Sequence, residues 1–395
     1  MRVLFTTQPV LSHFHALVPL ALALKENGHQ VAFATGKNFG SVIRGVGFIH
    51  FPSGLDFDTN KDVIEILPDK ETIVAKFPSM KGIQQLYAFI LGLAPVMIGD
   101  LEKIVSEWKP ALLVRDPVEF GGYIIAENND LPYVTITWGV YMDPHFYIKE
   151  ALLELRRRYG LYDDAGLEKM DRYMVMSSLP PSWPYPNSPV YHVTHRFCSR
   201  PFDKSSNESL PEWIGLLPKQ PTLLVTLGTV FNRSYETFQA ILDGLSSEEV
   251  NVIMTVGRTM DPSQFKTPNH IKIVQYIPQS LLLPYCDAIL FHGGYNTLHS
   301  ALWHGLPMII IPMDGGDQLP NAQFCTELGV AEIIRDLPPQ PQVIRDSVRL
   351  VLGNSEYRDN ARKLQQEMRN LPDISNAVRR LESLAKREYS EQNLI

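Results

Sequence analysis

Residues 288–323 read AILFHGGYNTLHSALWHGLPMIIIPMDGGDQLPNAQ, and this stretch decides the fold. It contains two continuously apolar strands, 288–291 and 308–311, each followed by polar residues. Strands that are apolar throughout are typical of parallel sheets that are buried on both faces. In such sheets, ligands bind beyond the carboxyl ends of the strands. We therefore expect the polar residues after the two strands to lie on one rim of the sheet.

The same alternation of apolar strands and helical segments continues along the whole chain. The segment after the first strand has apolar residues at helical spacing and ends at Gly28, which is favoured at a helix C-terminus. The simplest assembly is an α/β fold of two doubly wound, Rossmann-like parallel sheets. The strands predicted for them are 3–6, 31–34, 112–114, 133–136, 223–227, 252–255, 271–274, 288–291 and 308–311.

Chain length and punctuation predict two domains. A length of 395 residues is sufficient for two ordinary domains. Residues 201–220 are polar and rich in proline and precede a new strand, so they are predicted to link domain 1–200 to domain 221–375. Residues 376–395 are predicted to form a C-terminal helix, which either packs back on the N-terminal domain or covers a sheet edge.

Composition excludes several classes of protein. Hydrophobic residues make up 45% and charged residues 20% of the chain, and the net charge of -7 disfavours a nucleic-acid or anionic-membrane partner. The three cysteines, Cys198, Cys286 and Cys325, match no metal or disulfide spacing, which favours a reducing cytoplasm. No leader or transmembrane segment is expected. Monomer and homodimer both remain open.

The turn at His292 has the composition of a phosphate site. Glycines such as Gly294 let a ligand approach the backbone, and the helix that begins near Asn296 and Thr297 offers N–H groups to an anion. An ordinary strand–turn–helix connection would look similar.

The second rim group is the pair Asp317 and Gln318, whose oxygens and amide suit sugar hydroxyls. The alternative is that Asp317 or Asn321 simply caps the next helix.

Taken together, these residues resemble the donor-binding signature of the inverting UDP-glycosyltransferase-like enzymes (glycosyltransferase family one), which have the GT-B fold, and in particular bacterial natural-product glycosyltransferases. The resemblance implies an acceptor-binding N-terminal domain and a nucleotide-sugar-binding C-terminal domain that face an interdomain cleft. The matching residues are Thr226-Leu-Gly-Thr229, Tyr276-Ile-Pro-Gln279, His292-Gly-Gly-Tyr-Asn-Thr297, Pro312, Asp317-Gln318 and Asn321-Ala322.

The resemblance also implies a role for each of these positions. Tyr276 would stack on the base of the nucleotide, and the backbone of Ile277 would pair with its edge. Asp317 and Gln318 would hold the sugar. His292, Asn296 and Thr297 would hold the diphosphate, with Thr229 assisting, and Gln279 and Gly294 would also belong to the donor site.

One position departs from the family. Many members that use UDP-sugars have a glutamate eight residues after the signature histidine, where it grips the ribose hydroxyls. Ser300 occupies this position here. The change favours a dTDP-sugar, which lacks the 2′-hydroxyl, and leaves a UDP-sugar open.

A general base is predicted in the loop after the first strand. An inverting transfer needs a base to remove the acceptor proton, and histidine suits this role near neutral pH. By resemblance the base is His13, although Ser12 replaces the usual glycine before it and His15 is a rival. Asp116 ends another strand and would orient the imidazole. The alternatives are a helix-start histidine without a task and a turn aspartate before Pro117.

The acceptor is predicted to be a hydrophobic, hydroxylated small molecule. Long connections rich in aromatic residues are typical of pockets for such molecules. Trp138, Tyr141 and Phe146 follow a predicted strand end and are the preferred contacts, although any one of them could belong to the core.

The prediction is therefore an inverting, metal-independent glycosyltransferase (a hexosyltransferase) with no cofactor beyond its nucleotide-sugar co-substrate. Asp56-Phe57-Asp58 is formally a D-x-D metal motif, but no metal is expected. A membrane-associated enzyme that glycosylates a lipid or sterol, and a non-catalytic nucleotide-sugar-binding helper, are the alternatives. The first strand–helix turn, residues 7–12, contains no glycine, which excludes a dinucleotide-dependent oxidoreductase.

Overall fold

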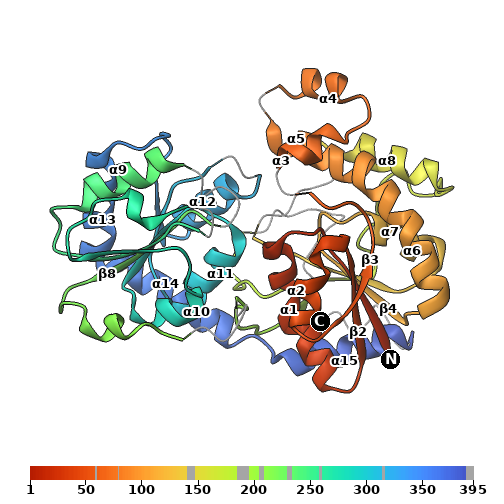
Figure 1. Cartoon of the computed structure of the whole chain (residues 1–395). Helices are drawn as coiled ribbons and strands as arrows, with labels where there is room; N and C mark the ends of the chain where they lie inside the picture. The colour runs from red at the N-terminus through yellow and green to blue at the C-terminus, as the bar shows by residue number, and fades with distance from the viewer. Residues whose placement is uncertain are drawn as a thin grey trace. The chain divides into compact units, whose positions relative to one another are not determined.

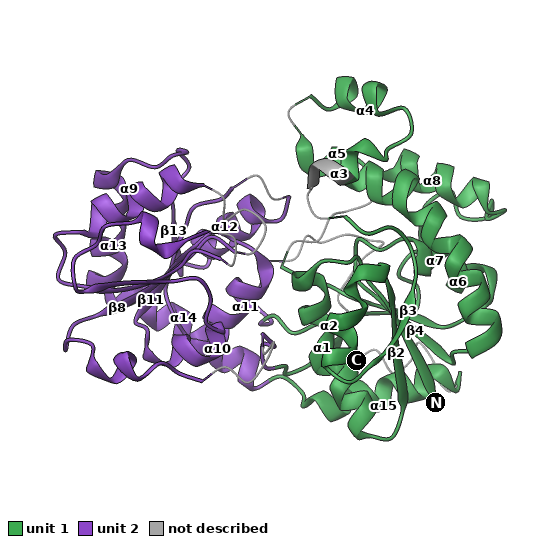
Figure 2. Cartoon of the chain, in the orientation of Figure 1, with its two compact units in different colours: residues 1–179, 185–199, 371–395 green, residues 180–184, 200–370 purple. Residues whose placement is uncertain are grey.

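The computed structural model describes residues 1–57, 60–78, 80–139, 147–184, 195–203, 209–228, 234–257, 260–313 and 316–387 (Figure 1). The chain divides into two compact units (Figure 2). The first comprises residues 1–179, 185–199 and 371–395, and the second comprises residues 180–184 and 200–370. Each unit is built on its own parallel sheet, as the sequence predicts.

The sheet of the first unit has the order β3-β2-β1-β4-β5-β6-β7, with all neighbouring strands parallel. Its strands are β1 (Arg2–Thr6), β2 (Gln30–Thr35), β3 (Ile49–Pro52), β4 (Leu112–Arg115), β5 (Tyr133–Ile136), β6 (Met174–Ser177) and β7 (His195–Arg196). Its helices are α1 (Leu11–Glu26), η1 (Lys37–Phe39), α2 (Gly40–Gly45), α3 (Asn60–Glu65), α4 (Lys70–Lys76), α5 (Lys81–Tyr87), η2 (Ala88–Leu93), α6 (Ala94–Trp108), α7 (Gly121–Asn128), α8 (Lys149–Arg158) and α15 (Ile374–Ala385).

The register of this sheet positions its polar rim. The central strand β1 is apolar and fully buried at Val3, Leu4 and Phe5, because it has a strand on each side and helices over the sheet. Thr6 of β1 pairs with Arg115 of β4. The residue that follows each strand, Thr7 and Asp116, therefore emerges at the same carboxyl edge.

The sheet of the second unit has the order β10-β9-β8-β11-β12-β13 and is also entirely parallel. Its strands are β8 (Thr222–Thr226), β9 (Asn251–Thr255), β10 (Ile271–Val274), β11 (Ala288–Phe291), β12 (Met308–Ile310) and β13 (Ala331–Ile333). Its helices are η3 (Glu212–Leu216), α9 (Tyr235–Leu245), η4 (Pro262–Gln264), α10 (Gln279–Leu282), η5 (Leu283–Tyr285), α11 (Tyr295–His304), α12 (Gln318–Glu327), α13 (Pro341–Gly353) and α14 (Ser355–Arg369).

The quoted stretch forms the middle of this second sheet. Phe291 at the end of β11 pairs with Thr226 of β8 on one side and with Ile310 of β12 on the other. The segments that follow these three strands therefore share one rim. This is the arrangement that the two apolar runs predict.

All nine predicted strands are present, with ends that differ by at most one residue, whereas β3, β6, β7 and β13 were not predicted. These four strands are short or lie toward a sheet edge, and β3 is only partly buried. Their sequences therefore lack the continuous run of branched apolar residues that marks a central strand. The helix after β1 ends at Glu26, and Gly28 follows with φ 82, the left-handed conformation that favours glycine.

The C-terminal helix α15 belongs to the first unit, where it packs against α1. The His29 imidazole bonds the Glu382 carboxylate (Nε2 to Oε1, 2.8 Å), and Arg387 pairs with Asp130 at 2.6 Å. The apolar segment near residue 90 folds into η2 and α6. Within the parts of the chain that the structure describes, no helix is long and apolar enough to cross a membrane.

Candidate active site

His13 and Asp116 meet at the carboxyl edge of the first sheet. His13 lies in the first turn of α1, and its Nδ1 is 3.0 Å from Oδ2 of Asp116. The Asp116 side chain is fully buried, and the His13 side chain is 16% exposed. Because an ionised carboxylate only accepts hydrogen bonds, the Nδ1 of His13 donates here and the Nε2 lone pair is left to take a proton. The structure thus joins the two predicted catalytic residues.

Asp116 is held by four hydrogen bonds. Its Oδ2 accepts from the Thr7 hydroxyl at 2.9 Å and from the Gln8 backbone N–H at 3.0 Å, in addition to His13. Its Oδ1 accepts from the backbone N–H of Val118 at 2.8 Å. Two of these donors are backbone groups, which have no residue-specific signal in the sequence. Thr7 could have been found as the first polar residue after β1.

These contacts keep Asp116 ionised. Burial alone would raise the pKa of Asp116, but the neighbouring His13 and the N–H groups of Gln8 and Val118 lower that pKa below its ordinary value. A buried, ionised carboxylate can fix the tautomer of the imidazole beside it and stabilise the imidazolium that forms on proton transfer. The pair therefore has the chemistry of a general base and its orienting acid.

Trp138 packs against His13. Its ring makes an edge contact with the His13 imidazole, with 4.3 Å between ring centroids and an interplanar angle of 72°. Trp138 follows β5 and is half-buried, so it contributes an apolar wall beside His13. The other two predicted acceptor contacts, Tyr141 and Phe146, lie outside the described residues.

In the second unit, His292 packs between two glycine turns. A Cβ added to Gly228 would lie 2.6 Å from the His292 ring, and one added to Gly294 would lie 2.5 Å from its Nε2. Gly228 and Gly293 also have φ of +79 and +92, where other residues are strained. The glycines of the two motifs therefore make room for an imidazole at the end of β11.

The surroundings of His292 keep it neutral. The side chain is half-buried, and its Nδ1 is enclosed without a hydrogen-bond partner among the described residues. Burial lowers the pKa of His292 to about 4. A neutral imidazole near pH 7 can donate a hydrogen bond to a phosphate oxygen but does not add a positive charge.

The start of α11 is suited to an anion. Gly294 occupies the N-cap position and provides no side-chain cap, so the first turn depends on other partners for its N–H groups. Thr297 lies in this turn, and its Oγ1 accepts from Nε2 of Gln279 at 3.0 Å. The hydroxyl hydrogen of Thr297 then remains to donate elsewhere. Asn296, in the same turn, is half-buried. Thr229, the remaining residue predicted at the diphosphate, lies outside the described residues.

Asp317 and Gln318 begin α12 at the same rim. Asp317 is the N-cap residue but makes no side-chain capping bond; its Oδ2 accepts from Nδ2 of Asn321 at 3.3 Å instead. Asn321 also donates to the carbonyl of Gly293 at 3.0 Å and so connects this pair to the turn after β11. Gln318 is buried, and its Oε1 accepts from the backbone N–H of Met313 at 2.7 Å. Its amide nitrogen is left as its remaining hydrogen-bonding group.

The predicted base-binding residues lie on the segment after β10. Tyr276 is half-buried, and its hydroxyl donates to the carbonyl of Asp203 at 3.1 Å, while Ile277 is buried. The Asp203 carboxylate also accepts from the N–H of Ser280 at 2.8 Å. Ser300 lies in α11 and is only 5% exposed, so this position carries a short hydroxyl and no carboxylate.

One aspartate of the D-x-D triplet makes a local hydrogen bond. The Asp56 carboxylate accepts from the backbone N–H of Asn38 at 3.0 and 3.1 Å, and Asp58 lies outside the described residues. Among the residues that the structure describes, no group of three or more His, Cys, Asp or Glu side chains could hold a metal ion.

Two units, each with a doubly wound parallel sheet and a polar rim beyond its strand ends, are what the resemblance to GT-B glycosyltransferases predicts. Comparison with known proteins agrees. Residues 22–159 match the N-terminal domain, and residues 239–384 the C-terminal domain, of the family described as "Erythromycin biosynthesis protein CIII-like". The chain belongs to this family. The predicted resemblance to bacterial natural-product glycosyltransferases is confirmed.

Relatives match along almost the whole chain. The aclacinomycin-T 2-deoxy-L-fucose transferase of Streptomyces galilaeus is 25% identical, with 97% of this chain and 96% of the relative covered. The 3-alpha-mycarosylerythronolide B desosaminyl transferase of Saccharopolyspora erythraea is 24% identical, with 98% of each covered.

Solved structures show the same fold. The calicheamicin glycosyltransferase CalG4 matches with a TM-score of 0.80 at 22% identity, covering 98% of this chain and 99% of the other. The glycosyltransferase VinC in complex with dTDP matches with a TM-score of 0.76 at 23% identity, covering 98% and 100%.

Proposed function

We propose that this chain is an inverting glycosyltransferase that moves a sugar from a nucleoside-diphosphate sugar to a hydroxyl of a hydrophobic natural product. The observation that carries the proposal is the 3.0 Å bond between His13 and the buried Asp116. A non-catalytic nucleotide-sugar-binding helper has no use for a base held in this way, so the dyad favours an enzyme.

The dyad supplies the proton chemistry of the transfer. Nε2 of His13 takes the proton of the acceptor hydroxyl while that oxygen attacks the anomeric carbon. The nucleoside diphosphate leaves from the opposite face of the sugar, so the configuration inverts. Asp116 holds the imidazole in the tautomer that leaves Nε2 unprotonated and stabilises the imidazolium that results.

The rim of the second unit holds the donor. The neutral His292, the first turn of α11 and the Thr297 hydroxyl donate to the diphosphate. Asp317 accepts from sugar hydroxyls, with the Gln318 amide beside it. Tyr276 stacks on the base, the backbone of Ile277 pairs with the edge of the base, and Gln279 acts through Thr297. Thr229 and Asn296 complete the group by family resemblance.

A dTDP-sugar is the donor that this rim fits best. The buried Ser300 provides no carboxylate to grip two ribose hydroxyls, and deoxyribose has no 2′-hydroxyl to be gripped. VinC, which shares the fold, is described in complex with dTDP. Calorimetric titration with dTDP, UDP and GDP tests the preference. Selective binding of UDP would contradict it.

The acceptor is a polyketide-like aglycone. The relatives act, by their names, on erythronolide, methynolide and aclacinomycin compounds. Trp138 gives the base an apolar neighbour suited to such a ring system. A panel of hydroxylated macrolactone and anthracycline aglycones, incubated with dTDP-glucose or UDP-glucose and followed by mass spectrometry, identifies a working acceptor.

His13→Ala tests the mechanism with that acceptor. Loss of a general base lowers kcat by about 10²–10⁴-fold. The affinity for dTDP should stay unchanged, because the residues proposed to bind it belong to the second unit. Turnover that survives the substitution would overturn the proposal. The transfer should also survive EDTA, since the dyad needs no metal; complete loss in EDTA would point to the D-x-D residues instead.

A further inference from the structure

Arg115, the last residue of β4, contacts the whole turn that carries Asp116. Its Nη1 donates to the carbonyl oxygens of Asp116, Pro117 and Glu119 at 3.4, 3.4 and 3.0 Å. The turn also supplies the N–H of Val118 that bonds Asp116. One guanidinium therefore draws together the carbonyls of the segment on which the position of the dyad carboxylate depends.

Arg115 is itself fixed by a buried ion pair. Its Nη2 donates to Oδ1 of Asp171 at 3.2 Å, and the two side chains are only 1% and 5% exposed. The hydroxyl of Thr135, from β5, donates to the same oxygen. A buried charge without a partner is strongly unfavourable, so each member of the pair restricts where the other can lie.

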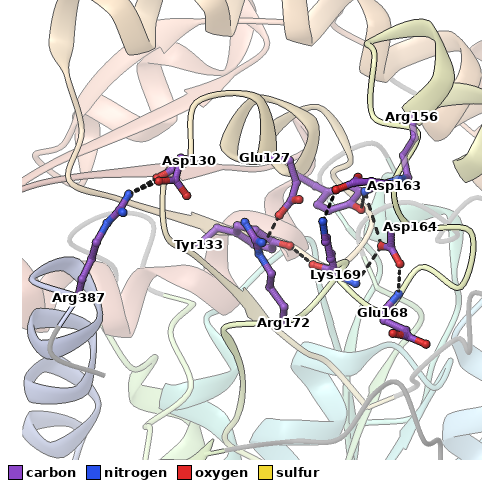
Figure 3. A network of polar contacts seen from close by, with 11 residues as sticks. Glu127, Asp130, Tyr133, Arg156, Asp163, Asp164, Glu168, Lys169, Arg172 and Arg387 are labelled. Atoms are coloured by element: carbon purple, nitrogen blue, oxygen red, sulfur yellow. Dashed lines mark hydrogen bonds and ion pairs between the residues drawn. The ribbon is translucent and has the colours of Figure 1, made fainter. Parts of the chain in front are cut away.

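Lys169 and Arg172, which lie on either side of Asp171 in the chain, each make a contact that is drawn in Figure 3. Before Asp171, the hydroxyl of Tyr133 donates to the carbonyl of Lys169. After it, Arg172 pairs with Glu127 of α7 at 3.1 Å. Asp171 is thus a fixed point from which Arg115 reaches the turn after β4.

We propose that Arg115, anchored by Asp171, is a positioning residue for the transfer: it holds the turn after β4 so that the Asp116 carboxylate faces His13. This inference rests on the proposed function, because the position of Asp116 matters to turnover only if the dyad removes the acceptor proton. Arg115 acts through Asp116 and does not touch the substrates.

The substitution Arg115→Lys separates the two contacts of the guanidinium. A lysine retains the charge opposite Asp171 but has a single nitrogen, which cannot serve Asp171 and three carbonyls together. A small displacement of a catalytic group costs up to about 100-fold in rate, so kcat should fall about 10–100-fold. The KM for the donor should change by less than about twofold, because the residues proposed to bind the donor belong to the second unit and are not altered.

Arg156→Lys is the matched control. Arg156 is equally buried in the same unit, and it pairs with Asp163 and Asp164 and contacts the Tyr123 hydroxyl. Among the described residues, none of these partners belongs to the turn after β4. Its substitution should lower the melting temperature, as Arg115→Lys does, and leave kcat close to that of the wild type. Equal losses of kcat in both variants would mean that any buried arginine has this effect, and would overturn the inference.

A double-mutant cycle shows whether Arg115 acts through Asp116. In the Asp116→Asn background the dyad is already disabled, so adding Arg115→Lys should lower kcat no further than about twofold. A purely structural arginine would cost the same factor in both backgrounds, and that result would overturn the inference. If Arg115→Lys does not fold, Asp171→Asn, which keeps a hydrogen bond to Thr135, replaces it in the cycle.

The cycle also distinguishes the two proposals. If Asp116→Asn alone leaves kcat unchanged, the dyad mechanism fails and the role of Arg115 fails with it. If Asp116→Asn lowers kcat but Arg115→Lys does not, the dyad stands and only the positioning role is wrong. Calorimetric titration with dTDP confirms in each variant that the second unit is intact.

Discussion

His13 and His292 both lie at the carboxyl edge of a parallel sheet, one in each unit. Each follows a buried central strand of a parallel sheet, β1 or β11, and lies at or just before the helix that begins there. Their neighbours differ. His13 faces a fully buried carboxylate at 3.0 Å, whereas His292 packs against glycines, and burial lowers its pKa. The strand end therefore fixes where a histidine lies, and its neighbours decide what the histidine can do.

The difference separates a base from a hydrogen-bond donor. An imidazole beside an ionised carboxylate can accept a proton, because the resulting charge is stabilised. An imidazole whose pKa is lowered to about 4 stays neutral at pH 7 and can only donate or accept a hydrogen bond. On this view, substitutions near His13 should affect kcat, and substitutions near His292 should affect donor binding.

The largest expected effect is that of Asp116→Asn. The amide cannot stabilise an imidazolium, and its NH₂ group meets donors where the carboxylate accepted bonds from Gln8 and Thr7. We expect kcat to fall by about 10²–10⁴-fold, the range of a lost general base, with dTDP affinity unchanged. Steady-state transfer rates and calorimetric titration measure the two quantities. A rise in KM with an unchanged kcat would contradict the assignment of Asp116 to proton transfer.

His292→Ala should have a smaller effect on a different quantity. A hydrogen bond to a charged group contributes about 1.5–3 kcal/mol, so the Kd for dTDP should rise by roughly 10–150-fold. The fall in kcat at saturating donor should be much smaller than for Asp116→Asn. Calorimetric titration with dTDP measures the change. Unchanged affinity would remove His292 from the donor site.

The control for this substitution is His270→Ala. His270 is a half-buried histidine of the same unit, 3.4 Å from the carbonyl of Leu245 and away from the rim, so dTDP affinity should not change.

Gly294→Ala disturbs the His292 ring without deleting it, because the new Cβ would lie 2.5 Å from Nε2 of His292. It should weaken dTDP binding, whereas Gly99→Ala, where a Cβ meets nothing within 4 Å, should not.

The sequence predicted the parts of the fold that depend on burial. The central strand β11 is apolar throughout and β1 is apolar at its three middle residues, and both were placed to within a residue. The edge strand β3 is only partly buried and has no such pattern. The two histidines and Asp116 each follow a central strand, which places them at a sheet rim, but the choice of His13 over His15 rests on the family resemblance.

The remainder of the site could not be predicted, because it depends on contacts between distant residues. Nothing local in the sequence tells that Arg115 reaches Asp171, or that Asn321 bonds the carbonyl of Gly293. The neutral state of His292 likewise depends on burial in the folded chain. Gln318 has a strong motif, yet its Oε1 bonds the backbone of Met313, a partner that a motif does not specify.

The smallest expected effect is on stability and not on catalysis, and it concerns Glu119. Burial raises the pKa of Glu119 to about 7, and the nearby charge of Asp116 adds to this effect, while the pKa of His292 is lowered to about 4. The folded state therefore binds the Glu119 proton more tightly than the unfolded chain and the His292 proton less tightly. The stability from Glu119 is present below about pH 4.5 and is lost as the pH rises through 7. The stability from His292 is present above about pH 6.5 and is lost as the pH falls through 4.

Glu119→Gln keeps an oxygen to accept from the N–H of Gly122 but has no proton to lose. Relative to the wild type, its free energy of unfolding should therefore rise between pH 5 and pH 8, by roughly 1–3 kcal/mol, since each pKa unit corresponds to about 1.4 kcal/mol. For His292→Ala the free energy of unfolding relative to the wild type should change in the opposite direction: it should rise as the pH falls from 7 to 5. Denaturant unfolding of the three proteins at pH 5, 7 and 8 measures both slopes. If neither variant's free energy of unfolding changes with pH relative to the wild type, the two sites do not differ electrostatically. If both differences change in the same direction with pH, one of the two pKa directions is wrong.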